Sequence, residues 1–136
     1  MDRGVSGSTL GPVNFITVGI SIKPLAGAPV PMNPGDRGAV PVAILGSATF
    51  DASTVDVGSL RLGPGDATVF SPGNSGGAKS TLLDVNGDEF PDLLVHFPNQ
   101  QIQVQCGSTS LLLTGKTTNG TPIRGTESIQ TVSCQP

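Results

Sequence analysis

Apolar and polar residues alternate along several short stretches of this chain. The clearest is residues 14–23, where every second side chain is apolar: Ile16, Val18, Ile20 and Ile22. A period of two is that of a β-strand with one buried face. Residues 93–97 repeat it, with Leu93, Val95 and Phe97 on one face and His96 on the other. The pattern therefore predicts strands at both places.

Shorter apolar or alternating runs predict seven more strands, at 39–45, 59–62, 67–70, 81–83, 101–105, 111–117 and 128–134. Because Pro41 lacks a backbone donor, we expect it on an edge strand or at a bulge. Residues 49–57 predict a short helical turn capped by Asp51 or Ser53. Between these elements lie turn signals, among them a proline-rich loop at 24–38, a glycine-rich loop at 71–80 and the Asn119-Gly120 hairpin turn.

Eight or nine short strands with turn signals about every 8–12 residues are typical of a β-sandwich. The predicted fold class is therefore all-β, a single-domain antiparallel β-sandwich of jelly-roll or Ig-like type. We expect it to span residues 14–136. Residues 1–13 are expected to be a flexible leader or an assembly strand.

Composition agrees with one small folded domain. The 136 residues include 19 Gly, 12 Pro, no Trp and no Tyr, and only 12% are charged, which excludes a charged helical bundle or a coiled coil. The net charge is −3 and the seven Lys and Arg residues are scattered, so no basic stripe favours a nucleic-acid partner. The longest apolar runs are about five residues, far short of a membrane span.

Four of the ten acidic residues fall within 84–92, whose sequence is DVNGDEFPD. Oxygen-bearing side chains stand at the first, third, fifth and ninth positions: Asp84, Asn86, Asp88 and Asp92. Carboxylates so close together repel one another unless a cation neutralises them. Oxygen ligands in this number suit Ca²⁺, with the Phe90 carbonyl as a further ligand and Gly87 permitting the tight turn.

The match to an EF-hand loop is partial. An EF-hand has Gly at its sixth position and Glu at its twelfth, where this chain has Glu89 and Val95. The flanking segments predict strands instead of helices. A solvated acidic hairpin is the alternative, since Asp, Asn and Gly also favour turns.

The segment from Asp84 to Val95 resembles the D-x-[DN]-x-D-G-x-x-D-L calcium loops of FG-GAP and VCBS-type segments in integrin-like and bacterial surface proteins. Residues 20–132 more broadly resemble an uncharacterised module of large secreted bacterial and archaeal proteins. The resembling stretches are IKP at 22–24, VPVAILG at 40–46, FDASTVD at 50–56, LTGK at 113–116 and GTPI at 120–123. The resemblance implies an extracellular, calcium-binding β-sandwich of no known activity.

The two cysteines, Cys106 and Cys134, are too few for a zinc site, which needs about four ligands. A disulfide between them, two buried thiols and a reactive thiol all remain open. A disulfide would favour an oxidising, extracellular or cell-surface location. No signal peptide is visible at the start of the chain, so we expect that one has been removed if the protein is secreted.

Other candidate sites have simpler interpretations. His96 and Asp92 lie about 13 Å apart on a strand, too far for a catalytic pair. Asp51 and Asp56 could be paired carboxylates of a glycosidase, but turn caps or further calcium ligands are the favoured interpretation. Asn119-Gly120-Thr121 is a formal glycosylation sequon within a predicted turn. The glutamines of 100–105 are expected on a solvated sheet face, with a sugar or protein ligand as the alternative.

We therefore expect a non-catalytic, extracellular structural or adhesive module, with other protein modules or copies of itself as partners. Strand addition between copies would make it a subunit of a surface fibre. The alternative is a carbohydrate-binding module of a secreted enzyme. The absence of Trp and Tyr weakens that alternative, because such modules usually stack aromatic rings on sugars.

Overall fold

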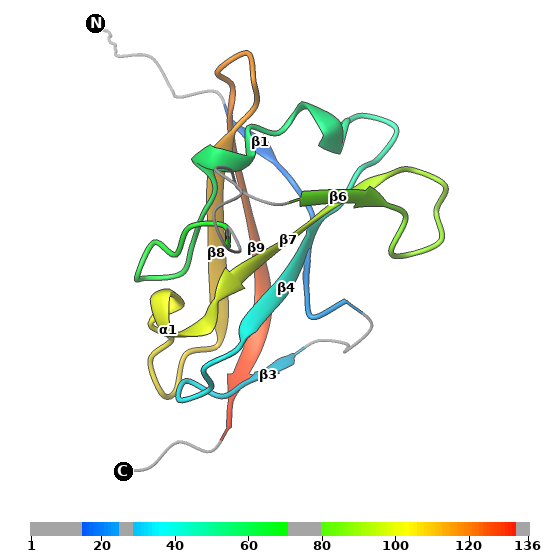
Figure 1. The fold of residues 1–136 in the computed structure, drawn as a ribbon. Coiled ribbons are helices and arrows are strands. Elements are labelled where there is room, and N and C mark those ends of the chain that lie inside the picture. Colours follow the sequence, from blue (N-terminus) through cyan, green and yellow to red (C-terminus); the bar gives the residue numbers. More distant parts are fainter. Residues whose placement is uncertain (1–14, 25–28, 71–79, 133–136) are drawn as a thin grey trace, which may run out of the picture.

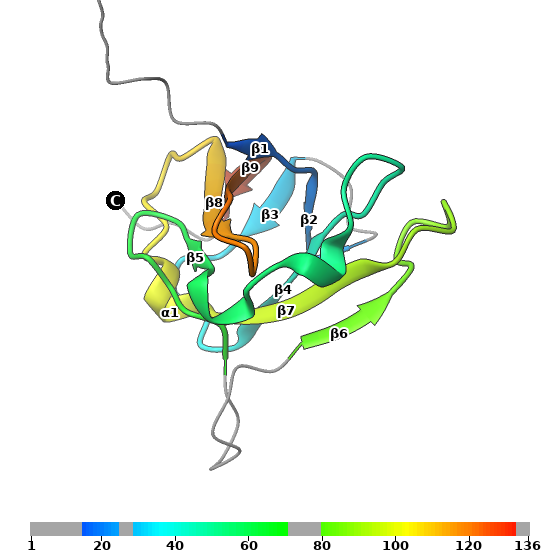
Figure 2. The same cartoon turned by 90° about the horizontal axis from the view of Figure 1, so that it is seen from above.

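Two packed β-sheets form the molecule, confirming the predicted β-sandwich. The structure is a computed structural model that describes residues 15–24, 29–70 and 80–132. The predicted leader at 1–13 and the loop at 71–79 lie outside the described residues. Figures 1 and 2 show the sheets from two directions, with the β8–β9 hairpin at one end of the sandwich and α1 toward the other.

The first sheet is antiparallel and has the order β2-β4-β7-β6. Its strands are β2 (Ile20–Ile22), β4 (Ala39–Ile44), β7 (Asp92–Pro98) and β6 (Ser80–Leu83). Within β7, Leu93, Val95 and Phe97 are buried and His96 is exposed, as the alternation predicts. This sheet carries the acidic segment between β6 and β7.

The second sheet has the order β1-β9-β8-β5, and β3 also pairs with β9. Its strands are β1 (Ile16–Thr17), β9 (Pro122–Thr131), β8 (Ser110–Lys116), β5 (Arg61–Leu62) and β3 (Val30–Met32). β1 and β3 run parallel to β9, whereas β8 is antiparallel to both β9 and β5. The core between the sheets is aliphatic apart from Met32 and Phe97, which are both fully buried.

The predicted single strand at 14–23 is wrong, because the chain changes sheets within it. Val18 N donates to Arg124 O of the second sheet at 2.8 Å, whereas Leu45 N, after β4 of the first sheet, donates to Gly19 O at 2.9 Å. The apolar side chains continue to alternate across this change because both halves face the same core. Periodicity alone therefore could not locate the break.

The proline-rich segment 24–38 is not a loop throughout, since β3 lies within it. Pro41 is not on an edge strand either, because β4 lies between β2 and β7. The Pro41 carbonyl accepts a hydrogen bond from Lys23 N at 2.7 Å. In an antiparallel strand the N and O of one residue point to the same side. The nitrogen of Pro41, which carries no hydrogen, therefore faces the chain just past the end of β2. This position explains why an inner strand can contain a proline.

The predicted strand at 101–105 is wrong. Residues Asn99–Ile102 form the short helix α1, and Gln103 follows in the left-handed conformation with φ +58°. That conformation reverses the chain, and both Ile102 and Val104 are buried. The glutamines consequently do not form a sheet face. The predicted strand at 67–70 is also wrong, since it is reduced to an isolated bridge between Ala67 and Leu62.

The last strand begins at Pro122, six residues earlier than predicted at 128. Its inward position 125 is glycine, because a Cβ there would lie 2.6 Å from Val18 O. The position thus carries no apolar side chain to signal a strand.

The predicted helical turn at 49–57 is confirmed as two 3-10 turns, η1 (Ala52–Thr54) and η2 (Val57–Ser59). Asp51 caps η1, and η2 replaces the first part of the strand predicted at 59–62.

Candidate metal centre

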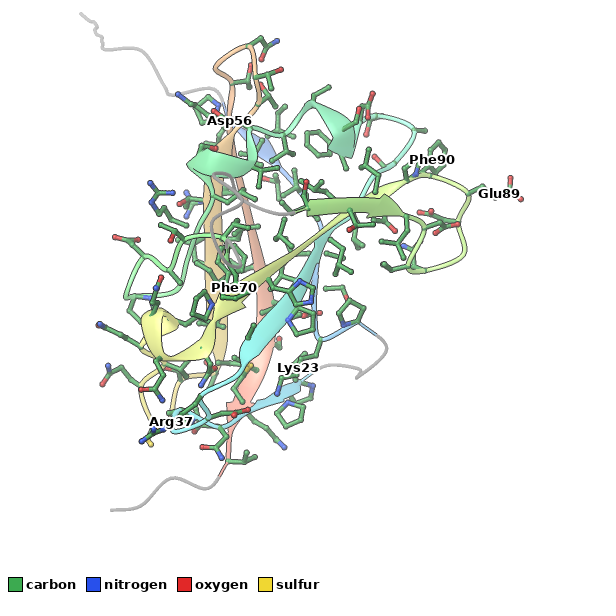
Figure 3. The ribbon with its side chains drawn as sticks, in the orientation of Figure 1. Lys23, Arg37, Asp56, Phe70, Glu89 and Phe90 are labelled. Carbon is green, nitrogen blue, oxygen red and sulfur yellow. The ribbon has the colours of Figure 1, made fainter. Side chains whose placement is uncertain are left out.

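The connection between β6 and β7 carries the acidic segment. Pairing of the two strands ends with Leu83 opposite Asp92, so residues 84–91 form a loop that leaves the sheet there. The loop extends from the side of the sandwich in Figure 1, and Figure 3 shows Glu89 and Phe90 on its outer part. All five predicted ligands therefore lie on one hairpin of the first sheet.

Three of these residues bring carboxylate oxygens together. One oxygen each from Asp84, Asp88 and Asp92 lies within 4.8 Å of the others. Two ligands on opposite sides of an ion with bonds of about 2.4 Å are separated by about 4.8 Å, so a single ion can contact all three. Asp84 and Asp88 are exposed, whereas Asp92 is fully buried. The triad could hold a metal ion with one side anchored in the fold and the other open to solvent.

Asp84 organises the start of the loop through its own carboxylate. Oδ1 accepts hydrogen bonds from the backbone N–H of Gly87 at 2.8 Å and of Asn86 and Asp88 at 3.3 Å. Oδ2 accepts from Glu89 N at 2.8 Å. The Glu89 bond is the main reason that the pKa of Asp84 is lowered below its ordinary value of 3.8. Asp84 is therefore a charged carboxylate at neutral pH.

Asp92 fastens the loop to the sandwich. Its Oδ1 accepts from Gly46 N at 2.8 Å and its Oδ2 from Val85 N at 2.8 Å. Each carboxylate oxygen has a second lone-pair site, so these bonds leave capacity for a metal. A Cβ on Gly46 would lie 2.2 Å from Pro91 O, which means that only glycine permits this approach of the chain after β4 to the loop.

Asn86 and Asp88 continue the chain of side-chain to backbone bonds. Asn86 Oδ1 accepts from Asp88 N at 3.3 Å, and Asp88 Oδ1 accepts from Phe90 N at 2.9 Å. Together with Thr49, the side chains of Asn86 and Asp88 line a cavity of about 300 Å³ at the β1–β2 junction. The ligand roles of Asn86 and of the Phe90 carbonyl stay predictions.

The loop turns at two residues with left-handed backbone, Gly87 at φ +79° and Glu89 at φ +72°. Glu89 stands where the resembling calcium loops have glycine. Its backbone nevertheless adopts the conformation that glycine would favour there. Glu89 therefore carries local backbone strain that a glycine at this position would not.

The remaining candidates have structural positions. Asp51 Oδ1 accepts from Ser53 N at 2.9 Å and from Ser53 Oγ at 2.6 Å, which lowers its pKa. Asp56 stands at the N-cap of η2 without a side-chain cap bond. His96 is exposed on β7 opposite Pro41. Asn119 lies in the β8–β9 turn, where its Oδ1 accepts from Thr117 Oγ1.

The cysteine prediction is only partly within the described residues. Cys106 lies in an exposed turn before β8 and is not a free thiol. Cys134 lies outside the described residues, so the Cys106–Cys134 pairing stays a prediction.

Gly46 is the residue of this site that sequence reasoning missed. Its N–H anchors Asp92, yet it follows a predicted strand and resembles an ordinary turn glycine. The only available signal was the position of Gly46 directly after the apolar run at 39–45. That signal is too general to indicate a contact with Asp92, which is 46 residues away in sequence.

The chain matches no protein-family model, no curated protein and no solved structure. Within the described residues, no helix has the length and apolar character needed to cross a membrane.

Proposed function

We propose that this chain is a non-catalytic, extracellular module with a structural or adhesive role, stabilised by a calcium ion in the β6–β7 loop. The observation that carries the proposal is the convergence of Asp84, Asp88 and Asp92 on one point, with Asp92 buried and bonded to the chain after β4. An ion bound there links an exposed loop to the interior of the fold. Metal binding then contributes to folding stability.

The donor chemistry supports calcium. All the converging atoms are hard carboxylate oxygens, and Asn86 and the Phe90 carbonyl would add two more oxygens from the same loop. Calcium accepts six to eight oxygens in flexible geometry, whereas magnesium demands a compact octahedron and keeps several waters. Extracellular calcium is plentiful enough for an exposed loop site of modest affinity.

A non-catalytic role is supported by the positions of the other carboxylates. Asp51 caps η1 through its side chain, which gives that carboxylate a local structural role, and Asp56 stands at the N-cap of η2 without a side-chain cap bond. The assembly of copies by strand addition involves residues 1–13, which lie outside the described residues, and stays a prediction.

The test is a thermal melt of the whole chain in calcium-free buffer and at increasing calcium concentration. Calcium at about a hundredfold excess over Kd should stabilise the protein by about 2.7 kcal/mol and raise Tm by several degrees. Magnesium at the same concentration should raise Tm less, because the loop does not offer rigid octahedral geometry. A Tm that is independent of calcium would refute the proposal.

Carbohydrate binding is the second candidate. It is favoured by one observation, the presence of two of the five phenylalanines, Phe50 and Phe90, in one cavity beside the metal loop. Aromatic rings are the usual contact surface for sugars.

A further inference from the structure

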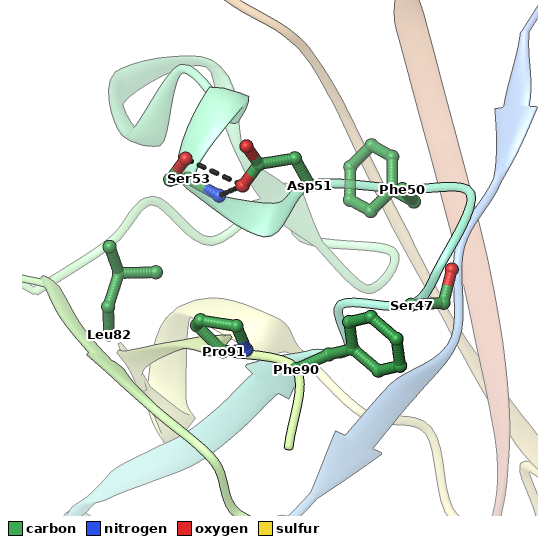
Figure 4. A pocket seen from close by; sticks show the side chains of 7 residues that line it. All are labelled: Ser47, Phe50, Asp51, Ser53, Leu82, Phe90 and Pro91. Carbon is green, nitrogen blue, oxygen red and sulfur yellow. Dashed lines mark hydrogen bonds between the residues drawn. The ribbon is translucent and has the colours of Figure 1, made fainter. Parts of the chain in front are cut away.

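A cavity of about 510 Å³ lies between the turn that follows β4, strand β6 and the end of the metal loop. Figure 4 shows Phe50 and Asp51 on one wall and Phe90, Pro91 and Leu82 on the other. The volume is in the range that holds a ligand or a large side chain.

Much of the cavity wall is exposed apolar surface. Leu82 is 49% exposed and Phe90 is 40% exposed, and Phe50 is half-buried against the core. Contiguous exposed apolar side chains mark interaction sites more often than isolated ones do.

The cavity also contains a carboxylate without a cation. Both bonds from Ser53 reach Asp51 Oδ1, and Asp51 Oδ2 accepts no hydrogen bond from the described residues. No lysine or arginine in the described ranges forms an ion pair with Asp51. Because the Ser53 bonds lower its pKa, Asp51 is ionised at neutral pH. A negative charge beside two phenyl rings suits a cation, which an aromatic face also attracts.

Within the part of the chain that the structure describes, strand β6 provides an edge next to this cavity. It is the last strand in the order β2-β4-β7-β6, and all four of its residues are exposed. An extended peptide can pair with such an edge through its backbone. A residue paired with Leu82 on an added strand would point to the same face of the sheet, with its Cβ about 5 Å from that of Leu82. An added strand would therefore place a side chain beside Leu82, which lines the cavity.

We propose that the β6 edge and this cavity together bind an extended segment of a partner protein that inserts one arginine or lysine between Phe50 and Phe90, beside Asp51. The inference deepens the proposed adhesive function and rests on it, because it names the partner chemistry. It selects a basic partner over a second copy, since each copy carries a net charge of −3 and the metal loop beside the cavity is itself acidic.

The metal loop should control this site. Phe90 and Pro91 lie between the ligands Asp88 and Asp92, and Phe90 N donates to Asp88 Oδ1 at 2.9 Å. Calcium would order the loop and so fix one wall of the cavity.

The experiment is selection of displayed random peptides on the whole chain in calcium, followed by affinity measurement on the enriched peptide. We expect enriched peptides to share one arginine or lysine, flanked at alternate positions by β-branched or apolar residues. Asp51→Asn should weaken binding by about tenfold, because asparagine still caps η1 but carries no charge. Replacing the arginine of the peptide by citrulline should have the same effect.

Matched variants control for charge and for aromatic surface. Asp66→Asn removes the charge of an exposed aspartate elsewhere and should leave peptide affinity unchanged. Phe90→Ala should abolish binding, whereas Phe70→Ala, a residue 44% exposed outside this cavity, should not. Absence of enrichment, enriched peptides without a basic residue, or equal effects of Asp51→Asn and Asp66→Asn would each overturn the inference.

Two other results would assign the cavity to a different ligand and would also overturn the inference. Binding on a glycan array that Phe90→Ala abolishes would assign it to a sugar. Self-association in sedimentation that Asp51→Asn abolishes would assign it to a second copy. Failure of the inference is separable from failure of the proposed function, because Asp51→Asn should melt with the same calcium response as the wild type. If calcium does not alter Tm while the basic peptide still binds, the metal proposal and the control of the cavity by the metal loop fail, whereas the peptide site stands.

Discussion

The β6–β7 and β8–β9 hairpin connections are built from the same kinds of residue, and they differ in charge. The β8–β9 turn at 117–121 is neutral. Thr117 N donates to Thr121 O at 2.8 Å, Gly120 N to Thr117 O at 2.9 Å and Thr121 N to Thr117 Oγ1 at 3.1 Å. Gly120 supplies the left-handed residue at φ +93°. Thr118 N donates outside the turn, to Thr54 O at 2.8 Å, so this turn is closed by neutral groups.

The β6–β7 loop has a similar network of side-chain to backbone bonds, but its acceptors are carboxylates. Four acidic residues and no basic one lie within 84–92. Backbone N–H groups from Asn86 to Glu89 partly neutralise Asp84, yet Asp84, Asp88 and Asp92 still approach within 4.8 Å. Turn chemistry closes both hairpins, and only the acidic one brings charges together that a cation would stabilise.

The largest expected effect comes from removing the buried side chain that anchors the β6–β7 loop, for which the β8–β9 turn has no counterpart. Asp92→Ala removes two hydrogen bonds from a buried carboxylate and leaves the N–H groups of Gly46 and Val85 without an acceptor. Bonds to charged groups contribute about 1.5–3 kcal/mol each, so we expect a loss of about 3–5 kcal/mol in the free energy of unfolding. Urea unfolding in calcium-free buffer measures it.

Asn119→Ala is the matched change in the neutral turn. It removes a side-chain acceptor that is exposed, so the expected loss is about 1 kcal/mol. Equal losses in the two variants would show that the buried anchor of Asp92 has no special importance.

A variant that removes one charge of the triad but keeps Asp92 should impair calcium binding in the presence of calcium and raise stability in its absence. In calcium, Asp88→Asn should weaken calcium affinity by about tenfold or more, because a charged ligand is lost. Without calcium, the same variant should be more stable than the wild type by about 0.5–1 kcal/mol, since repulsion within the triad is relieved. Titration calorimetry and calcium-free melts give the two quantities.

The control for this reversal is Asp66→Asn, which changes the net charge equally at an exposed aspartate outside the triad. It should leave calcium affinity unchanged. A loss of stability for Asp88→Asn in calcium-free buffer would contradict the view that the loop is repulsive when empty.

These same regions show how far sequence could predict structure. The alternation at 93–97 and the spacing of acids at 84–92 are local patterns, and both predictions agree with the fold and with the clustered carboxylates. The change of sheets at Val18–Gly19 depends on Arg124 and Leu45, which are distant in sequence. Periodicity cannot report such partners, because the side chains alternate in the same way whichever sheet the backbone joins.

A smaller effect concerns the backbone of the acidic loop. Glu89→Gly should raise the free energy of unfolding by about 0.5–1 kcal/mol, because glycine adopts φ +72° without strain. Gly87→Ala should lower it by about 1 kcal/mol. An added Cβ there meets nothing within 4 Å, so only the backbone conformation at φ +79° opposes it.

Asp66→Gly separates strain in this loop from strain elsewhere, because Asp66 also has left-handed backbone at φ +53°. It should stabilise the protein without altering calcium affinity, whereas Glu89→Gly should alter both. Calorimetry on the two variants makes the comparison, and an unchanged calcium affinity in Glu89→Gly would show that the turn at residue 89 does not affect the ligands.

The smallest expected effect is the acid dependence of the empty loop. The pKa of Asp84 in the folded state is lowered, chiefly by the Glu89 N–H, from its ordinary value of 3.8. The ionised carboxylate therefore contributes stability above that ordinary value, and the contribution is lost as pH falls through the lower folded value. Asp84 is exposed to solvent, which keeps the contribution small.

In calcium-free buffer, the wild type should lose more stability between neutral pH and strong acid than Asp84→Asn does. Asp51, whose pKa is also lowered, is present in both proteins and cancels from the difference. The β8–β9 turn has no carboxylate and cannot produce the difference. Urea midpoints measured across this pH range would contradict the assignment to Asp84 if the curves of the two proteins ran parallel.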